Sequence, residues 1–140
     1  MIGFEIKKLF FDREAVVSKV DAATRKVLSK FGAFVRRTAK GSIRHRKAAA
    51  PPGTPPSSHT GLLRKFIFFG YEPDRRSVVI GPVRLRRGGD APPLLEYGGE
   101  ATLERRGKRE RVTYKARPFM GPAFEKEQPK LPAMWRGSVR

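Results

Sequence analysis

Two neighbouring serines followed by a histidine, Ser57, Ser58 and His59, are the residues whose types come nearest to a catalytic set. A hydroxyl nucleophile beside an imidazole base is the pair used in acyl transfer, and it needs an acidic group that orients the imidazole. Consecutive residues on an extended backbone point in opposite directions, and no Asp or Glu occurs between Asp21 and Glu72. We therefore expect no catalysis from this segment.

Metal and nucleotide chemistry are not expected either. The chain has two histidines, His45 and His59, separated by a Pro-rich segment, and it has no cysteine. Its carboxylates do not cluster at the spacings that zinc or calcium sites use. Glu96 is a lone carboxylate, whereas general acid–base catalysis requires a positioned partner. The sequence thus predicts neither a cofactor nor an enzyme of any class.

Positive charge is the dominant property of the chain, with 31 Lys and Arg against 13 Asp and Glu and a net charge of +18. Such an excess favours polyanionic partners and destabilises an isolated compact chain by self-repulsion. Eleven cations fall between Asp21 and Glu72 without an intervening acid: Arg25, Lys26, Lys30, Arg36, Arg37, Lys40, Arg44, Arg46, Lys47, Arg64 and Lys65.

Three interpretations of this basic block stay open: contact with nucleic acid, contact with acidic partner subunits, or a solvated helix face. A nucleic-acid contact would act through counterion release, without sequence readout. The candidate contacts for DNA or an acidic partner are Arg36, Arg37, Lys40, Arg44, Arg46 and Lys47. A second basic cluster is expected at a hairpin tip, as a phosphate contact, a solvated tip or an arm reaching a neighbour: Arg105, Arg106, Lys108 and Arg109.

The chain contains no apolar run of the roughly 18 residues that a membrane span needs, so no membrane partner is expected. The N-terminus lacks the order of a signal peptide, and the absence of cysteine excludes disulfides. These features favour assembly inside a cell.

The periodicity of apolar residues predicts one long helix over residues 12–47, with Asp12 as its N-cap and Gly41 as a place where it can bend or stop. The apolar positions recur at steps of three and four: Val16, Val20, Ala23, Val27, Phe31, Phe34 or Val35, and Thr38.

A Pro-rich linker at 48–61 follows the helix, and strands and hairpins are predicted over residues 62–116. Two Pro and two Phe within eight residues predict an apolar plug and short helix at 117–127, followed by a C-terminal tail at 128–140. The individual expectations are strands at 62–69 and 77–83, a basic loop at 84–93, a helical turn at 94–97, and a hairpin of 101–104 with 111–115 around a charged tip.

The length suits one domain, residues 1–127, plus the tail. The predicted fold class is α+β: a long N-terminal helix packed on a small antiparallel sheet, with an extended charged hairpin and a Pro-rich linker.

Three signatures occur in a fixed order: residues 52–63 (PGTPPSSHTGLL), 94–99 (LLEYGG) and 117–124 (RPFMGPAF). Together they resemble the tail-completion or head–tail joining proteins found at the neck of long-tailed bacteriophages. Such proteins are typically small α+β subunits of closed rings between the head connector and the tail. The resemblance implies a non-enzymatic virion protein, assembled in the host cytoplasm, that surrounds the DNA channel.

The partners implied by this resemblance are further copies of the chain in a ring, taken as a hexamer, together with connector or adaptor proteins, tail proteins and non-specific DNA. A tail-terminator ring is an alternative, and a stand-alone nucleic-acid-binding protein is another. The candidate subunit-interface residues are Leu94, Glu96, Tyr97, Phe119, Met120, Pro122 and Phe124. Packing within one subunit is the competing interpretation for the plug at 117–124, and for Glu96 an ion pair with an arginine in a ring interface competes with a surface role.

Overall fold

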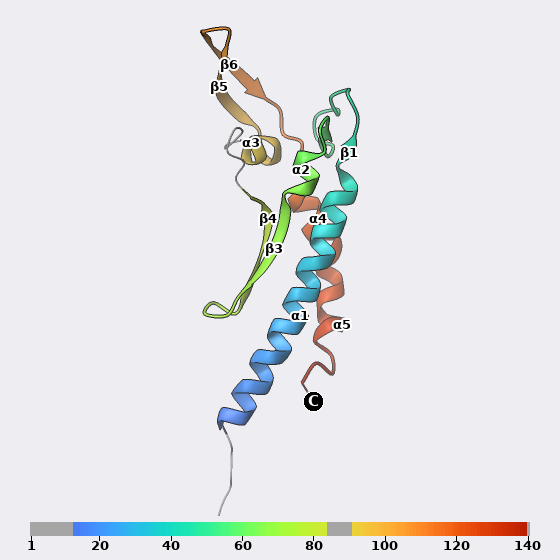
Figure 1. Ribbon diagram of the computed structural model, residues 1–140. Helices are drawn as coiled ribbons and strands as arrows, with labels where there is room; N and C mark the ends of the chain where they lie inside the picture. The colour runs from blue at the N-terminus through green and yellow to red at the C-terminus, as the bar shows by residue number, and fades with distance from the viewer. Residues whose placement is uncertain (1–12, 84–90, 140) are drawn as a thin grey trace, which may run out of the picture.

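The computed structural model describes residues 13–83 and 91–139. A long helix, α1 (Arg13–Ser42), runs through the molecule, with the β3–β4 hairpin on one side and α4, η1 and α5 on another (Figure 1). The β5–β6 hairpin projects beyond the C-terminal end of α1, and the first turns of α1 project at the opposite end. The predicted α+β fold with a long N-terminal helix is confirmed.

α1 ends at Ser42, before the predicted boundary at 47. The Ser42 hydroxyl donates a hydrogen bond to the carbonyl of Ala39 at 2.7 Å, and the next residue, Ile43, is buried in the core. The chain then forms the short strand β1 (Arg44–His45), which pairs in parallel with β2 (Ser57–Ser58) inside the Pro-rich segment. The helix thus ends next to Gly41, where the sequence predicted a bend or stop, and the extension to 47 was wrong, because burial of Ile43 and strand pairing replace the last helical turn.

The core lies where α1 meets β3 and α4. Its buried members recur at every fourth position along α1 and just beyond it, and are joined by the first residue of β3 and by the start of α4: Phe31, Val35, Ala39, Ile43, Ile67, Phe119 and Ala123. Of the two alternatives in the periodic pattern, Val35 is the buried one, while Phe34 stays partly exposed. Val16 and Val20, also in that pattern, are exposed on the first turns of α1, which project at one end of the molecule (Figure 1).

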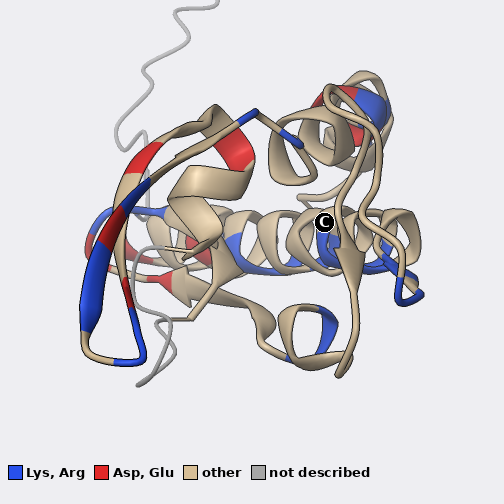
Figure 2. Ribbon diagram, turned by 90° about the horizontal axis from the view of Figure 1, so that it is seen from above, with Lys and Arg blue, Asp and Glu red and all other residues tan. Residues whose placement is uncertain are grey.

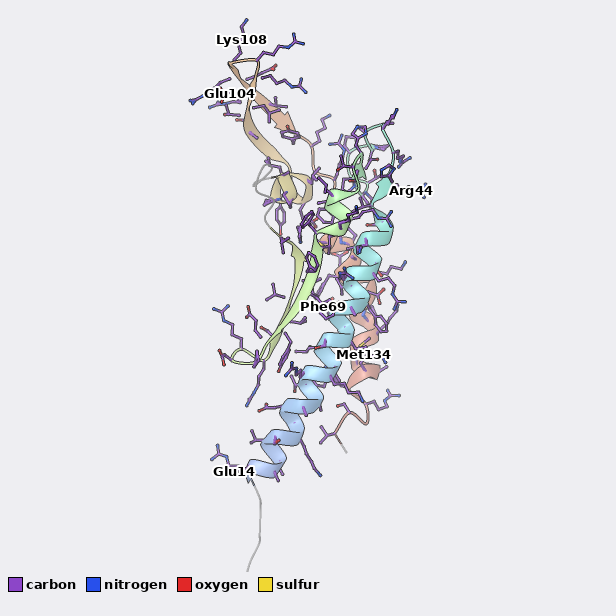
Figure 3. All side chains as sticks on the ribbon, viewed as in Figure 1. Glu14, Arg44, Phe69, Glu104, Lys108 and Met134 are labelled. Carbon is purple, nitrogen blue, oxygen red and sulfur yellow. The ribbon has the colours of Figure 1, made fainter. Side chains whose placement is uncertain are left out.

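The β3–β4 hairpin lies flat along α1. β3 (Ile67–Glu72) and β4 (Ser77–Pro82) pair antiparallel, with Phe69 opposite Ile80. Gly32 permits the close approach, because a Cβ atom there would lie 2.9 Å from side-chain carbons of both Phe69 and Val78. Figure 3 shows the Phe69 side chain between the strand and the helix.

The predicted strand at 62–69 is wrong in its first half. Gly61 takes a left-handed conformation (φ +73°), and residues Leu62–Lys65 form a single helical turn, α2. The amides of Lys65 and Phe66 close this turn by donating to the carbonyls of Gly61 and Leu62 at 3.1 and 3.0 Å. After the reversal at Gly61 and the turn of α2, the chain enters β3 with Ile67 buried in the core.

α3 (Ala91–Tyr97) leads into the second hairpin, formed by β5 (Gly99–Arg105) and β6 (Lys108–Tyr114). Arg105 pairs with Lys108, so the tip is a two-residue turn at Arg106–Gly107, both with positive φ. The strands are thus longer than predicted, because the tight turn lets Arg105 and the charged residues at 108–110 continue the ladder. The predicted basic loop lies mostly at 84–90, outside the described residues, as does the predicted N-cap Asp12.

α4 (Met120–Glu127) continues through η1 (Gln128–Lys130) into α5 (Leu131–Trp135), so the segment treated as a tail is helical for its first half. Leu131 and Met134 pack against the core cluster beside α1. Pro129 and Pro132 are each the second residue of these short helices, within the first turn, where backbone amides have no partner inside the helix.

Candidate functional site: a junction of three motifs and a basic helix face

The three sequence signatures, far apart along the chain, meet at one place, which we call the motif junction. Arg117 makes two of its contacts: its backbone amide donates to the carbonyl of Leu95 at 2.6 Å, and its Nε donates to the carbonyl of Ala50 at 2.7 Å. The amide of Gly53 donates to the carbonyl of Ala116 at 2.9 Å. These bonds join the Pro-rich segment, α3 and the chain that enters α4.

Glu96 holds the centre of this junction. Its carboxylate accepts three backbone hydrogen bonds at the start of α4, from Phe119 (2.9 Å), Met120 (3.0 Å) and Gly121 (2.8 Å). The first amides of a helix have no partner within the helix, and a negative charge there is favoured by the helix dipole. Glu96 is therefore a cap supplied by another helix, and it fastens α3 to α4.

Gly98 lets the β5–β6 hairpin leave this junction. Its φ is +72°, and a Cβ atom at this position would come within 2.9 Å of the Tyr114 carbonyl oxygen. Gly98, just before β5, therefore lies close against the backbone of Tyr114 at the end of β6. The Glu96 and Arg117 side chains of the junction form hydrogen bonds with backbone groups, amides in the first case and a carbonyl in the second.

The predicted interface residues divide into three kinds. Phe119 is 1% exposed and belongs to the core of the chain, so packing within one chain holds for this residue. Glu96 is engaged by backbone amides of the same chain and not by an arginine among the described residues. Tyr97 is 83% exposed and Phe124 is 43% exposed, and both offer surface to another molecule, although the Phe124 ring also meets Phe31 edge to face. The remaining three are partly buried or exposed: Leu94, Met120 and Pro122.

A line of cations follows one face of α1, and we call it the basic ridge: Lys19, Lys26, Lys30 and Arg37. At 3.6 residues per turn these positions fall within about 40° of one another, over a length of roughly 27 Å. All four side chains are exposed, and none forms an ion pair with any residue that the structure describes. The Lys30 ammonium and the Arg37 guanidinium lie 5.8 and 5.1 Å from the centre of the Phe34 ring, so both make cation–π contacts with it.

Two open grooves flank the basic ridge and share Lys30. One, of about 640 Å³, lies between α1 and the C-terminal segment and adds Arg136 to the cations of the ridge. The other, of about 530 Å³, adds Lys40 and Arg64. Among the described residues, no carboxylate lines either groove. The ridge is therefore a continuous cationic surface suited to a polyanion.

Arg36 differs from the other predicted contacts. Its Nε donates to the carbonyl of Ile67 at 2.6 Å, and its guanidinium lies 5.6 Å from the centre of the Phe68 ring. This side chain is half-buried and ties α1 to β3, so part of its role is structural.

The other predicted cations lie elsewhere. Arg44, Arg46 and Lys47 are exposed beyond the end of α1 and do not continue its face. Arg44 lies at the end of α1 opposite Glu14, whereas Lys108 marks the tip of the projecting hairpin (Figure 3). The four predicted tip residues are all exposed: Arg105, Arg106, Lys108 and Arg109. Figure 2 shows that the hairpin as a whole carries both basic and acidic residues.

Sequence reasoning missed Lys19 and Arg136, and it did not select Lys26, Lys30 or Arg64 as contacts. The run without acids drew attention to cations after Asp21, which excluded Lys19. The recurrence of the ridge positions on a single helical face would have identified all of its members. Arg136 could not be found in this way, because only the packing of α5 on α1 brings it near.

The Ser-rich segment is structural. The Oγ of Ser58 accepts a hydrogen bond from the amide of Gly61 at 3.1 Å, and Ser58 is buried. His45 stands beside Ser58 in the β1–β2 register, without a hydrogen bond between the two side chains. Within residues 13–83 and 91–139, no group of three or more His, Asp or Glu is placed to hold a metal ion. No helix in the same ranges is long and apolar enough to cross a bilayer.

Comparison with models of protein families, with curated proteins and with solved structures finds no match to this chain.

Proposed function

We propose that this chain is a structural subunit of the bacteriophage neck, a tail-completion or head–tail connector protein. In this proposal it forms a ring with copies of itself, joins the head connector to the tail, and surrounds the channel through which DNA passes. It acts by assembly in the virion and not by catalysis.

The observation that carries this proposal is the motif junction. Signatures 94–99 and 117–124, which suggested the family together with 52–63 by their order alone, are joined directly by hydrogen bonds of Arg117 and Glu96. Signature 52–63 is held beside them, because Gly53 bonds to Ala116 and Arg117 bonds to Ala50. Motifs that meet in space act as one structural unit, and this unit sets the direction of a projecting hairpin (Figure 1). A framework of this kind, whose polar groups bind backbone instead of a substrate, suits a building block better than an enzyme.

Exposed apolar side chains on two parts of the molecule support the proposal of assembly. Val16, Val17 and Val20 are each at least 40% exposed on the projecting turns of α1. Phe68 and Val79, in the β3–β4 hairpin, are 46% and 55% exposed. Apolar surface of this kind marks sites of protein contact, and closed rings are the commonest way for repeated head-to-tail contacts to end.

The basic ridge fits the second part of the proposal, contact with DNA. Cations on a straight helix meet phosphates without reading bases, and DNA in transit must be contacted without sequence preference. Single-stranded binding usually relies on exposed aromatic platforms, whereas Phe34 lies beneath Lys30 and Arg37. These features favour the backbone of a duplex as the polyanion.

The test is removal of the chain from the phage that encodes it. Loss of the protein should leave filled heads and tails unjoined in negative-stain images, and the wild-type protein should be detected by mass spectrometry in purified virions. Normal joined particles without the chain would contradict the proposal. A tail terminator would instead give tails of abnormal length.

The basic ridge also favours a second candidate function, a stand-alone nucleic-acid-binding protein. The two candidates differ in a matched experiment with Lys26→Glu, Lys30→Glu and Arg37→Glu, compared with three exposed cations away from the ridge, Arg25→Glu, Lys65→Glu and Lys115→Glu. A stand-alone binder predicts tight duplex binding by a monomer or dimer, with each ridge contact contributing about 0.9 to the slope of log K against log salt. A neck protein predicts weak binding to free DNA, and particle completion that fails with the ridge variant alone.

A further inference from the structure

The β5–β6 hairpin has two open edges. Among the described residues, β5 pairs only with β6 and β6 only with β5. The outward-pointing amide and carbonyl groups of both strands therefore have no strand partner there. A two-stranded hairpin is marginally stable by itself, and an open edge is a template for another strand.

The two faces of the hairpin have different chemistry. One face carries apolar side chains that are only half-buried: Ala101, Leu103, Val112 and Tyr114. The residues of the other face are all exposed, and in register they are Glu100 with Thr113, Thr102 with Arg111, and Glu104 with Arg109. An apolar face half-covered within the chain gains from a further layer or from neighbouring strands.

Charge on the exposed face is separated by strand. β5 contributes Glu100 and Glu104, and β6 contributes Arg109 and Arg111, so one edge is acidic and the other basic. Arg105 and Lys108 flank the turn, and Glu110 lies on the apolar face opposite Leu103. The two edges of one hairpin are thus complementary to each other, and so are the opposite edges of two different copies.

We propose that the β5 edge of one copy pairs with the β6 edge of the next copy, so that successive hairpins form one antiparallel sheet around the assembly. This pairing rests on the ring proposed above. When copies are related by rotation about an axis roughly along the strands, β6 of one copy lies beside β5 of the next. Because the two strands of a hairpin run in opposite directions, the new pair is antiparallel too.

Charge pairing within a single hairpin explains the pattern less well. The one ion pair described on this face, Arg111 with Glu100, spans 3.9 Å between exposed side chains. Pairs of this kind contribute little to stability, because water screens them. Intramolecular pairing would be served equally by acids and bases alternating along each strand. Protection against edge pairing would place the same charge on both edges, whereas opposite edges attract.

The decisive variant exchanges the charges of the two strands: Glu100→Arg, Glu104→Arg, Arg109→Glu and Arg111→Glu together. It keeps the composition of charge, the net charge and every cross-strand pair within the hairpin. Each swapped copy remains complementary to other swapped copies, but its edges repel those of the wild-type chain. Circular dichroism and thermal melting check that the swapped chain folds.

The experiment mixes wild-type and isotope-labelled swapped chains, dissociates them, lets them reassemble and counts mixed assemblies by native mass spectrometry. We expect each chain to assemble with itself and mixed assemblies to be at least roughly tenfold rarer than random mixing, because like charges facing across an interface are strongly unfavourable. Random mixing, or chains that remain monomers, would overturn the edge pairing.

A second pair of variants keeps the test decisive if the swapped chain does not fold. One chain carries only Arg109→Glu and Arg111→Glu, so both edges are acidic, and the other carries only Glu100→Arg and Glu104→Arg, so both edges are basic. Neither should assemble alone, and a mixture of the two should assemble with strict alternation. Self-assembly of either chain, or no assembly of the mixture, would refute the pairing.

The outcomes separate this inference from the proposed function. Oligomers that mix freely and are found in virions would refute edge pairing and leave the neck function in place. Assemblies with selective mixing that are absent from virions would support edge pairing and refute the neck function.

Discussion

The two hairpins of this protein have the same local structure and opposite surroundings. β3–β4 lies along α1, with Ile67 fully buried and Phe69 facing Gly32. β5–β6 projects from the motif junction, and every residue of its turn is exposed (Figure 1). One hairpin completes the core, whereas the other extends away from it.

The difference follows from the residues at alternate positions. β3 and β4 carry aromatic and branched side chains on the face toward α1, and apolar residues also occur on the outer face. β5 and β6 carry four charged residues on one face, and on the other they carry apolar residues near the base and the charged Glu110, Arg105 and Lys108 toward the tip. A hairpin with so little apolar surface contributes little to a single-chain core. We infer that β3–β4 is needed for folding and β5–β6 for association.

The sharpest test of this comparison is truncation of one apolar residue in each hairpin. Ile67→Ala removes a fully buried side chain and should lower the free energy of unfolding by about 2–5 kcal/mol. Leu103→Ala removes a half-buried side chain in β5 and should cost less than about 1 kcal/mol. Urea titration measures both, and equal losses would show that the projecting hairpin also belongs to the core.

The close approach of β3–β4 to α1 predicts an effect at Gly32. Gly32→Leu places side-chain atoms where Phe69 and Val78 already lie, and should destabilise the fold by about 1–3 kcal/mol through overpacking. The matched control is Gly41→Leu, because nothing lies within 4 Å of a Cβ atom at Gly41. That change should stabilise the helix by up to about 1 kcal/mol. A neutral Gly32→Leu would mean that the hairpin is not held against the helix.

Glu96 fastens the base of the projecting hairpin to the packed part of the molecule. Glu96→Gln keeps an oxygen but removes the charge that accepts three amide bonds, and should lower the free energy of unfolding by about 1–3 kcal/mol. Faster amide hydrogen exchange at Phe119, Met120 and Gly121 should accompany the loss. Glu125→Gln, on an exposed position of α4, should leave stability nearly unchanged. Equal losses of stability in the two variants would contradict the role of Glu96 as the cap of α4.

The smallest expected effect is on the stability at acid pH, through the carboxyl of Glu127. Hydrogen bonds from Lys130 at 2.8 Å and from Thr38 at 2.6 Å lower the pKa of the Glu127 carboxyl, although its burial acts in the opposite direction. The stabilisation is therefore present above the carboxyl's ordinary pKa and is lost as pH falls through the lowered value of the folded state. Glu127→Gln should flatten this acid limb of the stability curve.

The control for Glu127 lies on the projecting hairpin. Glu100→Gln breaks an exposed ion pair of 3.9 Å and should leave stability nearly unchanged, because exposed pairs are screened by water. An acid limb that persists in Glu127→Gln would show that the bond between α4 and α1 does not depend on this carboxylate.

Local sequence determined the elements whose signals are local. The period of apolar residues identified α1 and most of its buried face, and the run of branched residues after the turn at 71–76 identified β4. The Gly98–Gly99 pair marked the end of α3. These signals succeed because helix and strand periodicity reflects which side chains must be buried together.

Prediction from local sequence failed where a contact with residues distant in the chain, or a chain reversal, decided the conformation. The last turn expected for α1 gives way to β1 because residues 57–58 pair with it, and the first half of the expected strand at 62–69 becomes α2 because Gly61 reverses the chain. The cationic residues at 44–47 therefore leave the helix face that they were expected to share.

The sequence by itself determined the charge of this protein, its long helix, its α+β class and the order of its three signatures. Only the tertiary structure decided that those signatures meet, that Glu96 caps a helix instead of facing solvent, and that Arg136 lies beside the cations of α1. The physical reason is that composition and periodicity are properties of neighbouring residues, whereas a cap or a groove is made by groups that only folding brings together.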